Sequence, residues 1–310
     1  MDAPRMFTML ERGHRTGGDP RSHTLMAAVG AFLWSLVCRN YTNATEETPR
    51  FPPVRHLVLE PEDIREKAVF VIGDIHGCLD ELLELVEKAR RTEQGREILF
   101  LFVGDLINKG PKNAEVVKYI RELKGLSVRG NNDESLIDEL RGDRSNLSSK
   151  YGWVAEMADE DIDYLLKMPY TISIPSINSM IVHAGIIPGR PLHAQSITDM
   201  VHMRNIIEED YFHGSGLRGD RHVTEGVAWA SLWPGPEHIY FGHDARRGLQ
   251  FHPKATGLDT GCVYGKELTG VFINYSKKLI SLKAHKVHKD TTLKKIKNNV
   301  KRNKGNQNNV

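Results

Sequence analysis

Apolar residues between positions 67 and 283 form two kinds of run that alternate along the chain. Residues 68–72 and 98–103 are continuous apolar runs that each lead into a Gly-Asp pair, which is typical of buried strands. Residues 79–86 instead carry leucine and valine at helical spacing, and 114–123 has a similar pattern. Further elements are expected at 126–129 (a strand) and at 133–140 and 153–167 (helices). The first half of this region therefore has the pattern of an α/β domain.

The second half of the region is expected to be rich in β-strands. Its short apolar runs predict strands at 171–174, 180–183, 238–242, 256–258 and 269–275. Residues 205–225 show no clear period, and we expect a long loop there. The sequence predicts an α/β (α+β) fold, with one principal domain over residues 67–282.

Residues 1–66 form an N-terminal extension in this interpretation. Its residues 25–38 are an apolar run that is shorter than the roughly 20 residues of a bilayer span but long enough for a signal-peptide core. Two N-x-T sequons, at Asn40 and Asn43, follow directly, and residues 45–53 have the composition of a linker. The run 25–38 is therefore either a membrane or secretory anchor or an amphipathic helix that packs on the main domain.

The formal net charge of +2 conceals two parts of opposite sign. Residues 283–310 hold nine of the 42 basic residues and one of the 40 acidic ones, which leaves the rest of the chain with 33 basic and 39 acidic residues. This basic tail has too few apolar residues to fold alone, so we expect it to be disordered. It is either simply solvated or makes an electrostatic contact with a polyanion such as RNA, polyphosphate or acidic lipid.

Composition excludes two further classes of protein. Three cysteines in 310 residues cannot provide a disulfide-stapled scaffold. A mean hydropathy of −0.41 excludes a polytopic membrane protein. What remains is a globular domain with unusual ends.

Metal-ligating side chains follow several of the predicted strands, at the point where each strand ends. Because sites in α/β sheets collect at the carboxyl ends of strands, we expect these side chains to converge in one crevice. The candidate ligands are Asp74, His76, Asp105, Asn131, His183 and His243. Mixed imidazole and carboxylate ligands suit Mn, Zn, Fe or Co better than Ca. Six ligands exceed one tetrahedral site, so a carboxylate shared between two divalent ions, a two-metal centre, is expected.

Each of these residues also has an ordinary structural interpretation. An Asp after a strand-ending glycine is often a helix cap, and a single histidine at a strand end is usually a hydrogen-bonded core residue. Five such elements in order along one chain favour the metal site over five unrelated coincidences.

The motifs GDIHG (73–77), GD…G (104–110), GN (130–131), HAG (183–185) and GH (242–243) resemble the signature of calcineurin-like metallophosphoesterases. Within that superfamily, GDLINKGP (104–111), residues 183–205 and GLDTGCVYGKELTG (257–270) are similar to bacterial symmetric diadenosine tetraphosphatase. Lys109 and GHDARRGLQ (242–250) look most like the eukaryotic ApaH-like phosphatases, which include polyphosphatases and mRNA decapping enzymes. The resemblance covers residues 67–282 and implies an αββα sandwich, two face-to-face sheets with helices outside.

The resemblance also implies a role for each candidate ligand. Asp74, His76 and Asp105 would hold the first metal, and Asp105 would bridge to a second ion. The second ion would be held by Asn131, His183 and His243. A bridging water would then attack phosphorus as hydroxide. Lys109 stands where phosphoprotein phosphatases have a phosphate-gripping arginine, and it provides a point charge in place of a bidentate fork.

Two positions depart from the family pattern together. Asn132 stands where the family usually has a histidine that protonates the leaving group, and Asn108 stands where phosphoprotein phosphatases have the aspartate that orients it. Asn132 can donate a hydrogen bond to phosphate but cannot act as a general acid. The enzyme is therefore expected to be slow, inactive, or directed to substrates whose leaving group needs no proton. Arg246 and Arg247 are candidate contacts to neighbouring phosphates, although one of them has an equal claim to be a plain surface residue.

The sequence thus predicts a metal-dependent phosphoanhydride hydrolase that acts on polyphosphate, dinucleoside polyphosphate or capped RNA. The alternatives are a protein serine/threonine phosphatase and a weak or inactive member that binds RNA or phosphorylated partners. The compartment stays open between the cytoplasm and a membrane-anchored location in a vacuolar or secretory compartment, because it depends on whether residues 25–38 anchor the chain.

Overall fold

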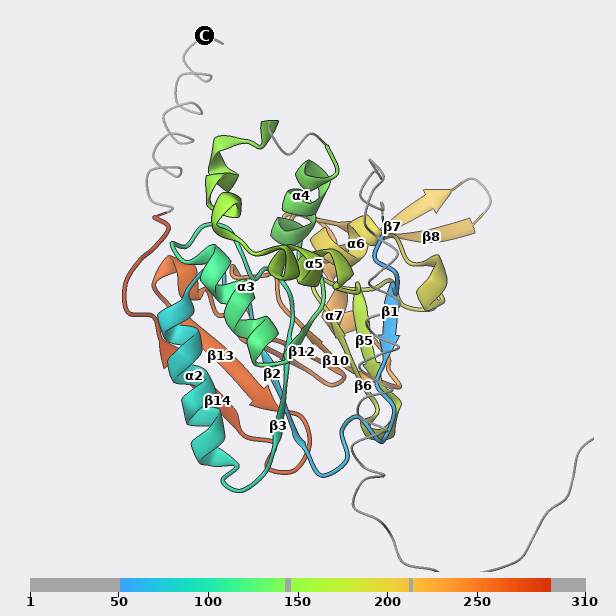
Figure 1. Cartoon of the computed structure of the whole chain (residues 1–310). Helices are drawn as coiled ribbons and strands as arrows, with labels where there is room; N and C mark the ends of the chain where they lie inside the picture. The colour runs from blue at the N-terminus through green and yellow to red at the C-terminus, as the bar shows by residue number, and fades with distance from the viewer. Residues whose placement is uncertain (1–50, 143–145, 212–213, 291–310) are drawn as a thin grey trace, which may run out of the picture. The chain divides into compact units, whose positions relative to one another are not determined.

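The computed structural model describes residues 51–142, 146–211 and 214–290, and these form two main β-sheets with helices on their outer faces (Figure 1). The first sheet has the strand order β14-β13-β2-β3-β4. Its strands are β2 (Ala68–Ile72), β3 (Ile98–Phe102), β4 (Leu126–Ser127), β13 (Glu267–Phe272) and β14 (Leu279–Lys283). Strands β2, β3 and β4 run parallel, so their carboxyl ends lie at one edge.

The second sheet has the order β1-β5-β6-β10-β12-β11. Its strands are β1 (His56–Val58), β5 (Thr171–Ile174), β6 (Ser179–Val182), β10 (His238–Phe241), β11 (Gln250–His252) and β12 (Ala255–Gly257). Strands β6, β10 and β12 are parallel neighbours, so the residues that follow them also meet at one edge.

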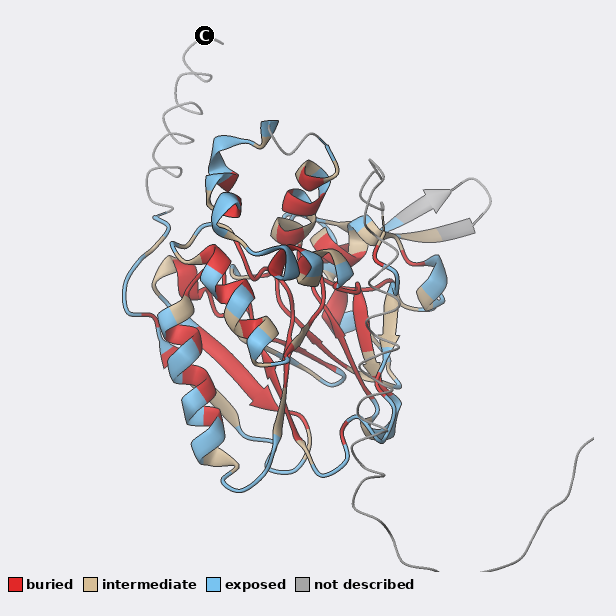
Figure 2. Cartoon of the chain, in the orientation of Figure 1, coloured by how far each residue is buried: buried red, intermediate tan, exposed pale blue. Residues whose placement is uncertain are grey.

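Alternation along the strands separates the inner from the outer face of the first sheet. Val69 and Val71 lie in a buried cluster with Ile172 and Ile181 of the second sheet, so this cluster fills the space between the two sheets. Phe70 and Ile72, one residue out of phase, belong instead to the core that packs under the outer helices. Those helices are α2 (Leu79–Thr92), α3 (Asn113–Glu122), α4 (Asn131–Leu140) and α5 (Asp159–Lys167). Figure 2 shows central strands such as β2 and β6 buried along their length, whereas these helices expose their outer faces.

The outer face of the second sheet has its own core. Val182 and Phe241 pack there with Met200 and Trp229, which belong to α6 (Ile197–His202) and α7 (Trp229–Leu232). Helices therefore cover the outer face of each sheet. The αββα sandwich that the sequence resemblance implied is confirmed.

The long loop expected at 205–225 is wrong. Strands β7 (Asn205–Tyr211) and β8 (Gly214–Asp220) form an antiparallel hairpin there, and β9 (Val227–Ala228) pairs with β7. The pattern missed this hairpin because its described side chains show no regular alternation of buried and exposed positions. Ile206 is buried, whereas Glu208 and Arg218 are exposed, so backbone pairing supports the ladder without a hydrophobic period.

The single helix expected over 153–167 is two elements. A 3₁₀ segment, η2, covers Ser149–Glu156, and the next two residues, Met157 and Ala158, are extended before α5 begins. Three acidic residues in the first turn of α5 favour a helix start at that point, because they face the positive end of its dipole. Short 3₁₀ turns, none of which the apolar pattern indicated, lie at η3 (Pro175–Ile177), η4 (Leu192–Ala194) and η5 (Cys262–Tyr264).

The sandwich begins before residue 67, where the sequence placed the boundary of the domain. Strand β1 pairs in parallel with β5, and Leu59 and Ile64 are buried in the cluster between the sheets. Three residues are too few to show a strand period, which explains why β1 was assigned to the extension. At the other end, residues 284–289 follow β14 as a fixed segment, since the Ala284 N–H donates to the Lys266 carbonyl.

The apolar run 25–38, the sequons and most of the basic tail lie outside the described residues. Within the described part of the chain, no helix combines the length and apolar character needed to cross a bilayer.

Candidate metal centre

The six candidate ligands follow five strands of the two sheets, and the structure brings them together. Asp74 and His76 follow β2, Asp105 follows β3, and Asn131 opens α4 after β4. His183 follows β6 and His243 follows β10, so both sheets contribute to one edge. We call this set of six residues the metal centre.

Tight backbone turns make this convergence sterically feasible. His76, Asp105 and His243 all have positive φ angles, of 50°, 51° and 67°, a strained conformation for residues with a side chain. A Cβ on Gly130 would clash with the Asp105 carboxylate, so only glycine permits the close approach there.

Asp74, His76 and Asp105 form the first half of the metal centre. All three are buried, and one ligand atom from each lies within 4.8 Å of the others. His76 Nε2 is 3.4 Å from Asp105 Oδ2 and 3.9 Å from Asp74 Oδ2. Asp74 is fixed by the backbone N–H of His243, which lies 3.1 Å from Oδ1.

Asn131, His183 and His243 form the second half. Asn131 Oδ1 lies 2.9 Å from His243 Nδ1 and 3.2 Å from His183 Nε2. His183 Nε2 is also 3.6 Å from Asp105 Oδ1. Asp105 thus touches both halves, one through each carboxylate oxygen, as a bridging ligand must.

One nitrogen of each imidazole faces a backbone carbonyl, which sets the tautomer. His76 Nδ1 lies 3.0 Å from the Ile107 carbonyl, and His183 Nδ1 lies 2.8 Å from that of Val103. His243 Nε2 lies 2.8 Å from the carbonyl of His202. Each of these nitrogens donates, so the other nitrogen of the neutral ring points a lone pair into the centre.

The chemistry of this donor set fits a metal ion. Two imidazole lone pairs and the Asn131 oxygen meet at hydrogen-bond distance, and none of the three carries a proton to share. Burial lowers the pKa of His76 to about 4, and it also lowers the pKa values of His183 and His243, so protonation does not resolve the conflict. Neutral imidazoles with their second nitrogen hydrogen-bonded are the form that ligates metals.

The pKa values of the two buried carboxyl groups, Asp74 and Asp105, are shifted in opposite directions. Burial raises the pKa of Asp74, and the neighbouring Asp259 and Asp105 raise it further. For Asp105, burial also acts to raise the pKa, but His183, His76 and Lys109 together bring it well below its usual range. Several buried acids around neutral imidazoles form a site that is stabilised by cations.

Lys109 reaches into the first half of the metal centre. Its Nζ lies 2.8 Å from His76 Nε2 and 5.6 Å from the centre of the Tyr264 ring. Burial lowers the pKa of Lys109, but Asp105, Tyr264 and Asp74 outweigh it and the net shift is upward, so the ammonium stays charged. A cation therefore already lies beside these ligands.

Asn132 and Asn108 lie together, and the amide of Asn132 hydrogen-bonds to the candidate ligand Asp105. Asn132 donates from its backbone N to Asp105 Oδ1 at 2.8 Å and from Nδ2 to Oδ2 at 2.6 Å. Asn108 Nδ2 donates to the carbonyl of Asn132 at 3.2 Å. Asn132, which replaces the expected acid, thus holds the Asp105 carboxylate, and Asn108, which replaces its orienting partner, holds the backbone of Asn132.

Of the two arginines after the last ligand, Arg247 is fully engaged inside the fold. Its Nη1 lies 2.5 Å from Asp244 Oδ2, and its Nη2 donates to Asn205 Oδ1 at 2.7 Å. Arg246 is exposed, so of the two arginines it is the candidate for a contact with a substrate phosphate.

Sequence reasoning missed two residues that fix the ligand loops. Asp133 is fully buried and accepts from the backbone N–H groups of Gly130, Asp105 and Leu106. Its place at the third position of α4, directly after the GNN turn, was the available signal, since acids there cap helices.

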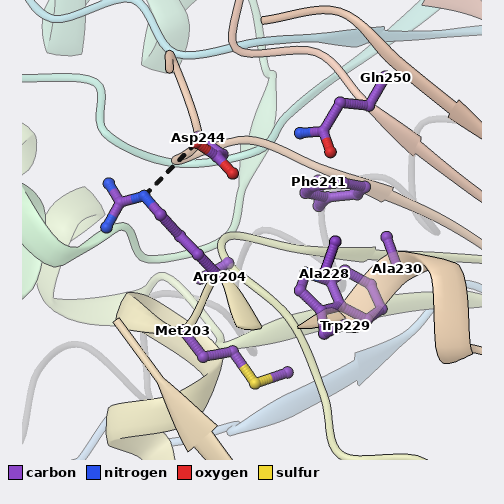
Figure 3. A pocket seen from close by; sticks show the side chains of 9 residues that line it. Met203, Arg204, Ala228, Trp229, Ala230, Phe241, Asp244 and Gln250 are labelled. Carbon is purple, nitrogen blue, oxygen red and sulfur yellow. Dashed lines mark ion pairs between the residues drawn. The ribbon is translucent and has the colours of Figure 1, made fainter. Parts of the chain in front are cut away.

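The second residue is Arg204, which Figure 3 shows paired with Asp244. Its Nη2 donates to the carbonyl of the ligand His243 at 3.0 Å, and its Nε lies 3.6 Å from Asp244 Oδ1. No period marks this residue. Only its place inside the conspicuous stretch 183–205 pointed to it.

Comparison with known proteins agrees with this geometry. A symmetrical bis(5'-nucleosyl)-tetraphosphatase from Photobacterium profundum is 29% identical over 259 residues, covering 65% of this chain and 93% of the relative. A zinc-dependent endopolyphosphatase from Saccharomyces cerevisiae is 24% identical over 304 residues, covering 82% and 93%. A crystal structure of a candidate diadenosine tetraphosphatase is 35% identical, with a TM-score of 0.65 over 74% of this chain and 98% of its own.

The fold is that of a metal-dependent phosphoesterase, and the chemistry of the candidate ligands fits metal ions. The profile of the calcineurin-like phosphoesterase family matches residues 67–265, and the chain belongs to that family. It is accordingly a hydrolase of the metallophosphoesterase class, whose members use two divalent ions.

Proposed function

We propose that this enzyme hydrolyses phosphoanhydride bonds in polyphosphate, in dinucleoside polyphosphates or in capped RNA. Relatives named for tetraphosphatase and endopolyphosphatase activities support this substrate class. The same chemical step, attack of water on phosphorus with a phosphate as leaving group, serves all three substrates.

We assign the residues of the metal centre to two ions. Asp74, His76 and Asp105 would hold one ion, and Asp105 with Asn131, His183 and His243 would hold the other. Two divalent ions there supply Lewis acidity and a water of lowered pKa as the nucleophile. The distances of Asp105 to both halves and the neutral imidazoles support the assignment.

The remaining side chains bind and orient the substrate. Lys109 would turn its ammonium from His76 toward a phosphoryl oxygen, because its side chain is exposed at the rim of the centre. Asn132 would hold Asp105 in the bridging geometry and donate to the substrate as the phosphate approaches. Arg246 would meet a neighbouring phosphate from the exposed side, whereas Arg247 supports the loop through Asp244.

Our choice of phosphoanhydrides as the substrate class depends on one feature: no acidic residue stands at the position that would protonate the leaving group. Neither Asn132 nor Asn108 can donate a proton, and both amides hydrogen-bond within the site. General acid catalysis contributes about 10²- to 10⁴-fold when the leaving group needs a proton. A serine alkoxide needs it, whereas a phosphate leaving from an anhydride is already a stable anion. The enzyme therefore favours anhydrides over phosphoserine.

The two alternatives fit less well. A protein serine/threonine phosphatase would lack its proton donor at Asn132. A binding protein without activity would have no need of three neutral imidazoles that face one two-metal centre, each fixed through its second nitrogen.

Steady-state kinetics on paired substrates test the proposal. For the two-metal enzyme, kcat/KM on long-chain polyphosphate or diadenosine tetraphosphate should exceed that on a phosphoserine peptide by about 10²-fold or more. The matched variant N108D/N132H, which restores the acid dyad, should raise the phosphoserine rate selectively. Comparable rates on both substrate classes in the parent enzyme would contradict the proposal.

We also propose that the two ends of the chain determine where the enzyme acts. An anchor at residues 25–38 would place it on a membrane facing a vacuolar or secretory lumen, and a docked helix would leave it in the cytoplasm. The basic tail would bring polyphosphate or RNA to the domain. Carbonate extraction, together with a glycosidase-sensitive shift at Asn40 and Asn43, separates the two locations.

A further inference from the structure

A cleft of about 490 Å³ opens beside the metal centre. Lys109 and Asn132 line its inner part, and Lys150, Trp153 and Lys289 line the rest. We call it the lysine cleft. Lys109 Nζ lies 2.8 Å from the candidate ligand His76, and Asn132 donates to Asp105, so the cleft adjoins the metal centre.

The lining of the lysine cleft carries charge of one sign. Three lysines line it, and no Asp or Glu does. The lysines come from separate parts of the chain: the loop after β3, the 3₁₀ segment η2, and the segment that follows β14. Like charges brought together by three distant segments repel one another unless an anion lies between them.

The segment that presents Lys289 is fastened to the domain. The N–H groups of His288 and Lys289 donate to the Val263 carbonyl at 3.1 and 2.9 Å. The His288 side chain, almost fully buried, lies with Nε2 3.3 Å from Glu81 Oε1 on α2. The backbone of Lys289 is thus fixed at Val263, the residue before Tyr264, whose ring centre lies 5.6 Å from Lys109 Nζ. His288 is a positioning residue for Lys289.

Lys150 contacts Glu139 and the Tyr151 ring, whose centre lies 4.4 Å from Nζ, and its largely exposed side chain can turn from them to a ligand. Its Nζ lies 3.5 Å from Glu139 Oε1, but the two side chains are 57% and 32% exposed. Exposed ion pairs of this kind contribute little, so a phosphate can displace Glu139 at small cost. The neighbouring Trp153 is fixed, since its Nε1 donates to the Lys150 carbonyl at 3.1 Å.

We propose that the lysine cleft binds the phosphates of the substrate that lie beyond the scissile one. Lys109 would contact the phosphate next to the metal centre, and Lys150 and Lys289 would contact those farther along the chain. The inference rests on the proposed function, and it adds that a run of consecutive phosphates is what this site recognises. The cleft volume lies within the range of 300–1,000 Å³ found for small-ligand sites, which suits several linked phosphates.

Kinetics as a function of substrate length test this inference. The variants K150Q, K289Q and their double are compared on long-chain polyphosphate, tripolyphosphate, diadenosine tetraphosphate and p-nitrophenyl phosphate. Each single variant should raise KM for long-chain polyphosphate relative to KM for p-nitrophenyl phosphate by about fivefold to tenfold. Each should also reduce the slope of log KM against log salt by about one. H288A should reproduce the K289Q effect in part.

Lys254→Gln is the matched control. Lys254 is exposed and directly precedes β12, at the end of that strand away from the metal centre, so its removal should change neither KM ratio nor salt slope. If K254Q and K150Q changed the KM ratio and the salt slope equally, the effect would come from the overall charge of the protein and not from the cleft, and the inference would be overturned.

The other outcomes separate the two proposals. If the parent enzyme hydrolyses polyphosphate but K150Q/K289Q keeps its chain-length dependence, the lysine cleft fails and the proposed function stands. If the parent enzyme cleaves no anhydride, the proposed function fails first. If W153F raised KM for diadenosine tetraphosphate alone and the lysine variants changed no KM, the cleft would bind a nucleoside. That result would overturn the proposal that it binds phosphates.

Discussion

Replacing Asp133 by asparagine should weaken both the fold and the bridging ligand. Asp133 Oδ2 accepts from the N–H groups of Asp105 and Gly130 at 2.8 and 2.9 Å, and Oδ1 accepts from that of Leu106 at 3.1 Å. An amide has one accepting oxygen, so its NH₂ group must face at least one N–H donor. In the better orientation only the Leu106 N–H loses its acceptor.

The expected cost follows from that one orphaned donor. A buried N–H without a partner costs about 1–3 kcal/mol, and the opposite orientation of the amide would orphan two donors. Because Asp133 holds the backbone of Asp105, the loop should also shift. A displacement of about 1 Å at a reacting group can cost about 10²-fold in rate.

Urea unfolding and metal analysis measure the two effects on one variant. Asp133→Asn should lose about 1–3 kcal/mol in the free energy of unfolding and bind less than two equivalents of metal. Asp138→Asn is the control, since Asp138 lies on the same helix α4 with a largely exposed side chain. An Asp133→Asn protein with parent stability and full metal content would refute the role given to these three hydrogen bonds.

Three further substitutions have defined outcomes. Lys109→Met should lower kcat/KM on polyphosphate by about 10- to 100-fold with metal content retained, because a charged phosphate contact is lost. Gly130→Ala should reduce metal binding in a metal titration, since the added methyl group meets the bridging carboxylate, whereas Gly152→Ala, with open space around it, should not. Leu101→Ala, fully buried between the sheets, should cost about 2–5 kcal/mol in the free energy of unfolding.

The strand ends were predictable from sequence because glycine and acid recur there in one local pattern. Each of the runs at 68–72 and 98–103 leads into Gly-Asp, and the residues directly before that pair are buried. The structure places both carboxylates at one edge. Local patterns of this kind survive folding unchanged, so the convergence of the six candidate ligands could be predicted before any geometry was known.

What escaped prediction depends on contacts between distant segments. The lysines at 150 and 289 look like ordinary solvated charges in sequence, and only the fold brings them to one cleft. The β7–β8 hairpin and β1 show no regular alternation of apolar and polar residues in sequence, because backbone hydrogen bonds to neighbouring strands hold them in place. The apparent loss of an acid dyad also gained a structural reason, since Asn132 supports Asp105 directly.

Metal content measured together with phosphate release from long-chain polyphosphate tests the central claim most directly. The purified enzyme should contain two divalent ions per chain, lose hydrolysis when a chelator removes them, and regain it as the second equivalent is restored. Protein without bound metal, or polyphosphate hydrolysis that persists after the metal is removed, would contradict the account.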